Sequence, residues 1–283
     1  MVGFHNLQAL GVMEKVRLIS MTPNDFGSVV AALTSSEPAE VYYLAGQSSV
    51  GLSFERPIET LESNSLGILN FLEAIRSFGK RVKLYHAGTG ECFGNLGLQA
   101  AKEDTPFRPI SPYAVAKAAT HWLVANYRDA YGLFACNGIL FNHESPLRPA
   151  RFVTQKIVST VGRIAAGSRE KLALGRLDIV RDWGWAPEYV DAMWRMMQQD
   201  EPDDYIVATG EAHSIEEFVS EAFALFELDW REHVVSDPVL FRPTDLLRNR
   251  GNPEKAAVKL GWQAHWRMRE VVRGMVEAAR GRA

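Results

Sequence analysis

Short apolar runs alternate with helical segments along the first half of the chain, and this alternation constrains the fold more than any other feature. Three runs have the length and composition of buried strands, at residues 40–45, 82–87 and 134–141. The segments between them carry apolar residues at helical spacing and end near Gly79 and Gly132, and Pro112 suits the first turn of the second helix. Strands and helices that alternate in this way predict a parallel sheet covered by helices on both faces.

The second half of the chain is less regular. Helices are predicted at residues 152–167, 186–199, 214–226 and 267–280, separated by loops and short apolar segments. We interpret residues 1–145 as a dinucleotide-binding domain and residues 146–283 as a smaller α/β region that binds substrate and is interleaved with the first.

The overall charge favours a small-molecule ligand. A net charge of −3 and a pI near 6.2 provide no general attraction to nucleic acid or to an anionic membrane. We find no apolar run long enough to span a membrane and no signal-peptide pattern, so a cytoplasmic location is expected. The two cysteines, Cys92 and Cys136, have no ligand-spaced partners, and we expect no metal site.

Tyr113 and Lys117 are the first candidate catalytic pair. Four residues apart on a predicted helix, they share one face. A lysine ammonium near a phenol is expected to lower the pKa of the tyrosine, which would suit it to proton transfer. The alternative is an exposed tyrosine beside a solvated lysine. The functional interpretation indicates a nicotinamide-dependent site of the short-chain dehydrogenase type.

Thr89 and Glu91 follow the second predicted strand, and active sites in such sheets lie at the carboxyl ends of the strands. On an extended chain they would point to the same side, where a hydroxyl and a carboxylate could polarise a substrate oxygen and move a proton. The alternative is a capping threonine and a solvated glutamate. The glycines at 88, 90 and 94 do not form a dinucleotide loop, because no helix follows them directly.

Four motifs in one order resemble the GDP-mannose 4,6-dehydratase family, a branch of the extended short-chain dehydrogenases. They are Ser111-Pro-Tyr-Ala-Val-Ala-Lys117, Phe141-Asn-His-Glu-Ser-Pro-Leu-Arg148, Arg181-Asp-Trp-Gly184 and Phe241-Arg-Pro243. The similarity runs from about residue 4 to about residue 278. It implies an N-terminally truncated Rossmann-like parallel sheet with a smaller C-terminal α/β region, and it implies NADP as cofactor and GDP-mannose as substrate.

The resemblance also implies roles for the candidate residues. Tyr113 would act as base at the carbon 4 hydroxyl, and Lys117 would be its partner and a ribose ligand. Glu91 would take the carbon 5 proton and assist loss of the carbon 6 hydroxyl, while Thr89 would hydrogen-bond the sugar. Oxidation at carbon 4 acidifies the carbon 5 proton, so one carboxylate can serve as base and then as acid.

Further binding residues follow from the same motifs. The resemblance implies cofactor contacts at Leu44, Ala45, Gly46, Gln47, Ser48, His143 and Arg148. It implies substrate contacts at Asn142, Lys156, Arg181, Arg242 and Asp245. Arginine suits a diphosphate because its guanidinium is always charged and binds in a bidentate manner.

The sequence departs from the family pattern at its N-terminal end. The family begins with a strand, a Gly-x-x-Gly-x-x-Gly loop and a helix, and none of these is present. That loop supplies backbone amides and a helix dipole to the pyrophosphate, so we expect weakened NADP affinity. We also expect an exposed edge or a gap in the sheet. Met21-Thr22 stands where the family has Gly-Asp.

Three functions fit these observations. The first is a sugar-nucleotide dehydratase, and the second is a non-catalytic protein that binds a GDP-sugar or a partner after loss of the cofactor loop. The third is a reductase or epimerase of the same superfamily, although those seldom need the threonine and glutamate pair. The resemblance implies a homodimer, because related enzymes pair through two long helices, which here would be those at about 61–78 and 112–131.

Overall fold

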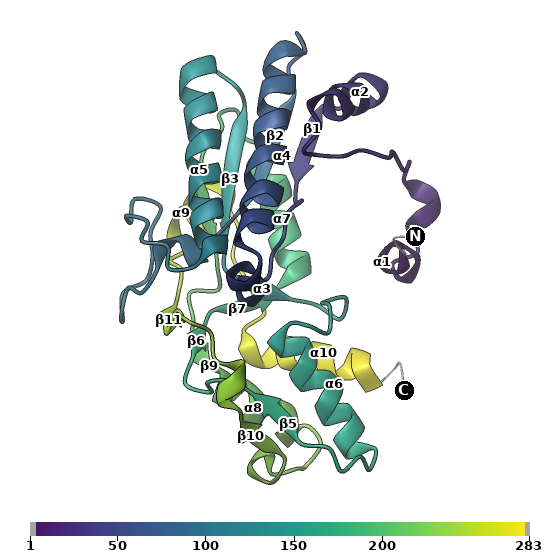
Figure 1. The fold of residues 1–283 in the computed structure, drawn as a ribbon, viewed down its shortest axis with the longest axis vertical. Coiled ribbons are helices and arrows are strands. Elements are labelled where there is room, and N and C mark those ends of the chain that lie inside the picture. Colours follow the sequence, from purple (N-terminus) through teal and green to yellow (C-terminus); the bar gives the residue numbers. More distant parts are fainter. Residues whose placement is uncertain (1–3, 281–283) are drawn as a thin grey trace.

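A computed structural model describes residues 4–280. At its centre lies a parallel sheet of four strands in the order β1-β2-β3-β8 (Figure 1). The strands are β1 (Glu40–Tyr43), β2 (Lys83–Thr89), β3 (Ala135–Leu140) and β8 (Tyr205–Val207). The predicted parallel sheet is confirmed, and the first three strands fall within two residues of the predicted runs. The fourth strand comes from the second half of the chain.

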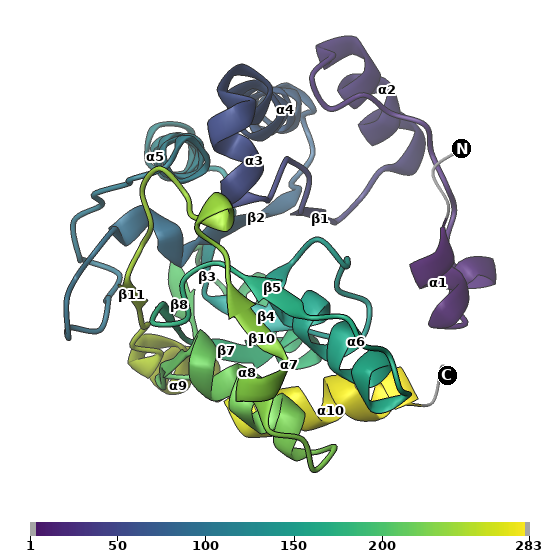
Figure 2. The same cartoon turned by 60° about the horizontal axis from the view of Figure 1, so that its bottom comes forward.

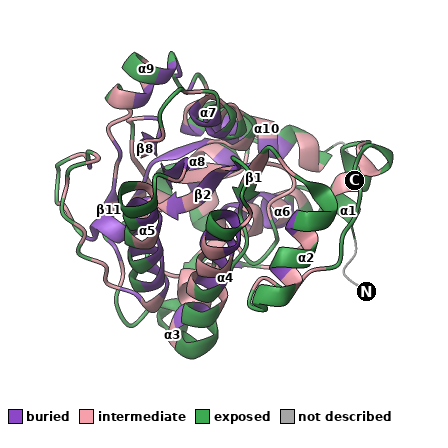
Figure 3. Ribbon diagram, turned by 90° about the horizontal axis from the view of Figure 1, so that it is seen from above, coloured by how far each residue is buried: buried purple, intermediate pink, exposed green. Residues whose placement is uncertain are grey.

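Helices cover both faces of this sheet, as predicted. On one face lie α2 (Phe26–Ser36), α4 (Pro57–Ser77) and α5 (Pro112–Tyr131), and on the other lie α7 (Ala186–Met197) and α9 (Glu254–Leu260). Successive residues of β2 point to opposite faces of the sheet, and both are apolar. Leu84 packs against the face covered by α2, α4 and α5, and Tyr85 packs against the face covered by α7 and α9. Figure 3 shows the exposed residues on the outward sides of these helices.

Helix α5 begins and ends where its local sequence dictates. The Ser111 hydroxyl accepts a hydrogen bond from the amide of Ala114, and Pro112 occupies the first turn. Gly132 ends the helix with φ of 66°, a left-handed conformation that favours glycine. The first turn therefore has a defined position, and it carries Tyr113.

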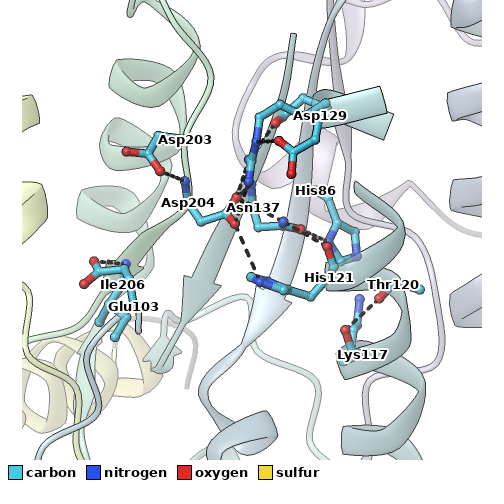
Figure 4. A network of polar contacts seen from close by, with 12 residues as sticks. His86, Glu103, Lys117, Thr120, His121, Asp129, Asn137, Asp203, Asp204 and Ile206 are labelled. Carbon is cyan, nitrogen blue, oxygen red and sulfur yellow. Dashed lines mark hydrogen bonds and ion pairs between the residues drawn. The ribbon is translucent and has the colours of Figure 1, made fainter. Parts of the chain in front are cut away.

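A buried polar network anchors α5 to the sheet (Figure 4). Arg128 donates two hydrogen bonds to Asp204, at 2.7 and 3.1 Å. Asn137 donates through its side chain to Asp204 at 3.0 Å, and its side-chain oxygen lies 2.8 Å from Nδ1 of His86. Burial opposes the ionisation of Asp204, but Arg128 outweighs it and lowers the pKa of this carboxyl.

The remaining elements form a second layer below the sheet (Figure 2). Three helices, α6 (Val153–Ala165), α8 (Ile215–Ala224) and α10 (Met268–Arg280), share one apolar core with a two-stranded sheet. That sheet pairs β5 (Leu172–Leu174) with β10 (Val234–Ser236). The helices α6, α7, α8 and α10 match their predicted ranges within two residues.

Short strand pairs connect the two layers. β4 (Asn142–Glu144) pairs with β7 (Trp183–Trp185), and β6 (Val180–Arg181) lies between β11 (Arg248–Asn249) and β9 (His213–Ser214). The other short elements are α1 (His5–Ala9), η1 (Met13–Lys15), α3 (Val50–Glu55), η2 (Gly90–Phe93), η3 (Trp230–Glu232) and η4 (Pro238–Leu240). Helix α1 lies apart from the sheet in both views and buries no residue. Within residues 4–280, no helix has the length and apolar character needed to cross a membrane.

Candidate active site

A cavity of about 520 Å³ opens at the carboxyl ends of β1, β2 and β3. Its walls come from both layers, because the loop after β1 faces residues of α6, β6 and the 240–249 segment. All four predicted catalytic residues, Thr89, Glu91, Tyr113 and Lys117, line this cavity. Residues distant in the sequence therefore meet at the expected edge of the sheet.

Thr89 and Glu91 lie at the end of β2, where the chain turns. Thr89 is the last residue of the strand, and its hydroxyl accepts a hydrogen bond from the amide of Glu91 at 3.3 Å. The backbone enters the short helix η2 at Gly90, so the expected extended geometry is wrong. Both side chains nevertheless reach the cavity. A Cβ atom on Gly90 would lie 2.8 Å from the Phe141 ring, so the turn requires glycine.

Tyr113 and Lys117 project from the first turns of α5, and both are buried. Burial raises the pKa of Tyr113, and a hydrogen bond with Thr89 only partly offsets this. The Lys117 ammonium donates to the carbonyl oxygen of Ala87 at 2.9 Å, and burial lowers its pKa to about 8. The expected lowering of the Tyr113 pKa by Lys117 is therefore wrong for this structure, since the ammonium is bonded to the backbone instead.

Glu91 faces a chain of alternating charges. Arg181 Nε lies 3.7 Å from Glu91 Oε1, and a terminal nitrogen of Arg181 lies 3.5 Å from Asp245 Oδ1. Arg242 reaches the same Asp245 oxygen at 3.4 Å. Arg181 is buried and also donates to the carbonyl oxygen of Leu246 at 2.6 Å, which holds its guanidinium in place. Burial lowers the pKa of Arg181, and the Glu91 and Asp245 carboxylates partly restore it.

The predicted cofactor loop after β1 lies along the cavity, except for one side chain. Leu44, Ala45, Gly46 and Ser48 line the cavity. Gln47 turns away, and its amide donates to Thr60 at 3.0 Å and to the carbonyl oxygen of Ser49 at 2.9 Å. Gln47 therefore joins the loop to α4 and is not part of the cavity wall.

His143 and Arg148, which were also predicted to contact the cofactor, line the cavity. Nδ1 of His143 is 2.8 Å from the carbonyl oxygen of Phe141, and the ring stacks on Tyr189 with centroids 4.7 Å apart. Burial lowers the pKa of His143 to about 4, so the ring is neutral at pH 7. The Arg148 guanidinium lies 3.7 Å from the centre of the Phe152 ring.

Glu144 and Thr154 also line the cavity and were not predicted from the sequence. Glu144 Oε2 lies 3.2 Å from Arg148 Nε, and it accepts a hydrogen bond from Thr154 at 2.8 Å. Burial raises the pKa of Glu144, against the effects of Arg148 and Thr154. No sequence pattern indicates this pair, because the i, i+4 spacing brings side chains together in a helix and neither residue lies in one.

The predicted substrate residues all lie on the cavity wall. They are Asn142, Lys156, Arg181, Arg242 and Asp245. The Lys156 ammonium is bonded to the carbonyl oxygen of Ala173 at 2.6 Å. Two further arginines, Arg151 and Arg176, line the same wall and were not predicted. Among residues 4–280, no group of three or more histidine, cysteine or acidic side chains could hold a metal ion.

Comparison with known proteins supports one family. The family model described as GDP-mannose 4,6 dehydratase matches residues 4–275. GDP-mannose 4,6 dehydratase 1 of Arabidopsis thaliana is 47% identical over 258 residues, which cover 90% of this chain and 71% of the relative. The human GDP-mannose 4,6 dehydratase is 42% identical over 273 residues, covering 90% and 73%.

Solved structures share the fold. RMD from Pseudomonas aeruginosa, complexed with NADPH, superposes with a TM-score of 0.86 at 23% identity, over 99% of this chain and 95% of that one. The Thermus thermophilus UDP-glucose 4-epimerase in complex with NAD has a TM-score of 0.84 at 28% identity, over 99% and 94%. The Rossmann-like α/β class predicted from the sequence is confirmed by these neighbours.

Proposed function

The chain belongs to the GDP-mannose 4,6 dehydratase family, and we propose that it is a hydro-lyase that converts GDP-mannose to GDP-4-keto-6-deoxy-mannose. The observation that carries this proposal is the meeting of Thr89, Glu91, Tyr113 and Lys117 on one cavity wall. A reductase or epimerase needs the tyrosine and lysine, but dehydration also needs a group that moves the carbon 5 proton. Glu91 is that group.

The cavity fits one half of NADP. Lys117 and Arg148 provide cations beside the apolar loop of Leu44 and Ala45, which suits a ribose and a neighbouring phosphate. Held beside Lys117 and Arg148, a nicotinamide would supply hydride transfer between carbon 4 and carbon 6 of the sugar.

Tyr113 is the base at carbon 4 in this proposal. Its phenol must lose its proton before it can accept the one from the sugar hydroxyl, and burial opposes that loss. Thr89 donates a hydrogen bond to the phenol oxygen, and Arg148 also favours the charged form. Lys117 holds the carbonyl of Ala87 and faces the cavity, where it orients the ribose.

Glu91 is the acid and base of the elimination step in this proposal. Its carboxylate takes the carbon 5 proton and passes it to the carbon 6 hydroxyl, which leaves as water. Tyr113 then returns the proton it received from the carbon 4 hydroxyl to carbon 5. The protons balance over one turnover, so the protein ends in the ionisation state in which it began. Arg181 lies beside Glu91, with its Nε atom 3.7 Å from a carboxylate oxygen, and can hold the side chain in position.

A basic part of the cavity wall suits the diphosphate of the substrate. Arg242, Lys156 and Arg176 line it, and their charges are only partly neutralised by Asp245 and Asp178. Arg181 is buried between Glu91 and Asp245, which couples the sugar end of the cavity to the diphosphate end. Asn142 and Asp245 complete the proposed substrate contacts.

Incubation of the chain with GDP-mannose and NADP tests the function. A 4-keto-6-deoxy product detected by mass spectrometry, and absent with the Glu91→Gln variant, is the expected result. Calorimetry with GDP-mannose serves as a parallel readout. Binding without product at saturating NADP would contradict the proposed activity and favour the non-catalytic alternative.

We further propose a homodimer that pairs through α4 and α5. Their outward faces expose Ile58, Leu61, Leu66, Val115 and Trp122, which is an unusual density of large apolar side chains. Light scattering should show a dimer that Trp122→Glu converts to a monomer, and a monomeric parent chain would contradict this. The cytoplasmic location expected from the sequence stays a prediction, which cell fractionation can test.

A further inference from the structure

One loop, residues 94–111, joins the two elements that carry the proposed catalytic groups. It leaves the η2 turn that holds Glu91, and it ends at Ser111, whose hydroxyl caps the first turn of α5. The two ends of the loop lie close together, because the amide of Arg108 donates to the carbonyl oxygen of Cys92 at 2.9 Å. A contact that fixes this part of the loop therefore also bears on the position of the catalytic groups.

The 240–249 segment contacts both ends of this loop. The hydroxyl of Thr244 donates to the carbonyl oxygen of Ile110 at 2.6 Å. The amide of Leu247 donates to the side-chain oxygen of Asn95 at 2.8 Å. Ile110 directly precedes the residue that caps α5, and Asn95 comes two residues after the η2 turn. One segment from the second half of the chain thus contacts the loop beside each catalytic element.

The same segment forms part of the proposed diphosphate wall. Arg242 and Asp245 line the cavity, and Arg242 lies 3.4 Å from Oδ1 of Asp245. Leu246 is buried, and its carbonyl oxygen accepts the hydrogen bond from Arg181. Residues 241–247 form neither helix nor strand, so these side-chain contacts decide where the segment lies. The segment therefore connects the charges of the wall directly to Thr244.

We propose that Thr244 and Asn95 are positioning residues that transmit occupancy of the diphosphate wall to the catalytic groups. A diphosphate bound by Arg242 fixes the 240–249 segment. The two hydrogen bonds then fix the start of α5 and the end of the η2 turn. Binding energy from a part of the substrate that does not react is thereby used to orient the groups that move protons. This inference rests on the proposed function, because it requires a nucleotide diphosphate at this wall.

Hydrogen exchange with GDP as the ligand tests the coupling without catalysis. In the parent chain, GDP should slow exchange at the amides of residues 240–249, 91–94 and 113–117. Thr244→Val removes the hydroxyl but keeps the charges of the wall, so GDP should still protect residues 240–249. The protection of residues 113–117 should fall by about 2- to 10-fold, which corresponds to the loss of one hydrogen bond. Asn95→Ala should reduce the protection of residues 91–94 in the same way.

Thr105→Val is the matched control. The Thr105 hydroxyl accepts a hydrogen bond from the amide of Lys102 at 2.9 Å, so this variant loses a contact within the loop and keeps those to the 240–249 segment. GDP should protect it like the parent chain. Thr244→Ser keeps the hydroxyl and should also behave like the parent. Thr244 and Asn95 are exposed, so the variants should fold, and thermal melting checks this.

Kinetics with GDP-mannose provide a second readout. Thr244→Val should lower kcat by about tenfold or more through misplacement of the reacting groups, while the Kd for GDP measured by calorimetry stays unchanged. Equal protection of residues 113–117 in the parent and in Thr244→Val would overturn the coupling and leave the proposed function intact. A weaker Kd with unchanged kcat would also overturn it, since Thr244 would then only shape the wall. A parent chain that binds no GDP would overturn the proposed function and, with it, the coupling.

Discussion

Arg181 holds its Nε atom 3.7 Å from a carboxylate oxygen of Glu91, although the two residues come from different layers of the molecule. Arg181 belongs to β6 and is fixed by the backbone carbonyl of Leu246, whereas Glu91 sits on the turn after β2. The proposed base is therefore positioned only when both layers are in place. Variants that disturb either layer should affect the same chemical step.

Replacement of Glu91 by glutamine should reduce kcat by about 10²- to 10⁴-fold, the usual contribution of a general acid or base. The amide cannot accept the carbon 5 proton, but it keeps the shape of the side chain. Exchange of the carbon 5 hydrogen with deuterated solvent, followed by mass spectrometry, isolates this step. The exposed Glu216→Gln variant on α8 is the control and should retain full exchange. Normal turnover by Glu91→Gln would assign the proton transfer to another group.

Because of Lys117, the free energy of unfolding should change with pH in the alkaline range. Burial lowers its pKa from 10.5 to about 8, so the unfolded chain binds this proton more tightly than the folded one. Between about pH 8 and pH 10 the unfolded state holds the proton that the folded state has lost, and the free energy of unfolding should rise from this group. Urea denaturation across that range should show the rise in the parent chain and lose it in Lys117→Met. Identical slopes would contradict the lowered pKa.

Removal of Arg128 should destabilise the fold strongly. Its substitution by alanine leaves the half-buried Asp204 without its main partner, and the loss of hydrogen bonds to a charged group typically costs about 1.5–3 kcal/mol. Chemical denaturation gives the free energy of unfolding. Arg163, paired with Glu170 on the surface, is the control, and its alanine variant should cost no more than about 1 kcal/mol. Similar losses of unfolding free energy in both variants would show that the network around Asp204 stabilises the fold no more than a surface ion pair does.

A methyl group at position 90 should damage both stability and activity. The new Cβ would lie 2.8 Å from the Phe141 ring, and such overpacking costs about 1–3 kcal/mol. The turn that carries Glu91 must then shift, so kcat should fall as well. Gly162→Ala in α6 is a matched control, because its Cβ meets nothing within 4 Å and a helical alanine should add about 0.5–1 kcal/mol of stability. An active and stable Gly90→Ala variant would contradict this account.

Much of the fold was predictable because its main elements are long or strongly apolar. The β2 and β3 runs are buried on both faces, and α5 has a proline at its start and a glycine at its end. Strand β8 was missed because three residues carry too little pattern to be recognised. Its place in the sheet depends on long-range contacts, such as that between Arg128 and Asp204, which sequence periodicity does not encode.

The candidate site was predictable at the level of positions and less so at the level of contacts. All but one of the site residues named from the sequence line the cavity, and Gln47 is the exception because it bonds to Thr60. The partner of Lys117 could not be predicted, since the Ala87 carbonyl is a backbone group present in every sequence. The pairing of Glu91 with Arg181 likewise required the two layers to be placed together.

The late position of Asp204 also bears on how the chain folds during synthesis. Arg128 and Asp204 are 76 residues apart, so α5 leaves the ribosome well before the carboxylate that pairs with it exists. At the usual rates of translation this interval lasts about 4–15 s. During that time Arg128 has only the adjacent Asp129 as an acidic partner, and the nascent sheet lacks its last strand. The first half of the chain is therefore expected to depend on chaperones until β8 has been translated.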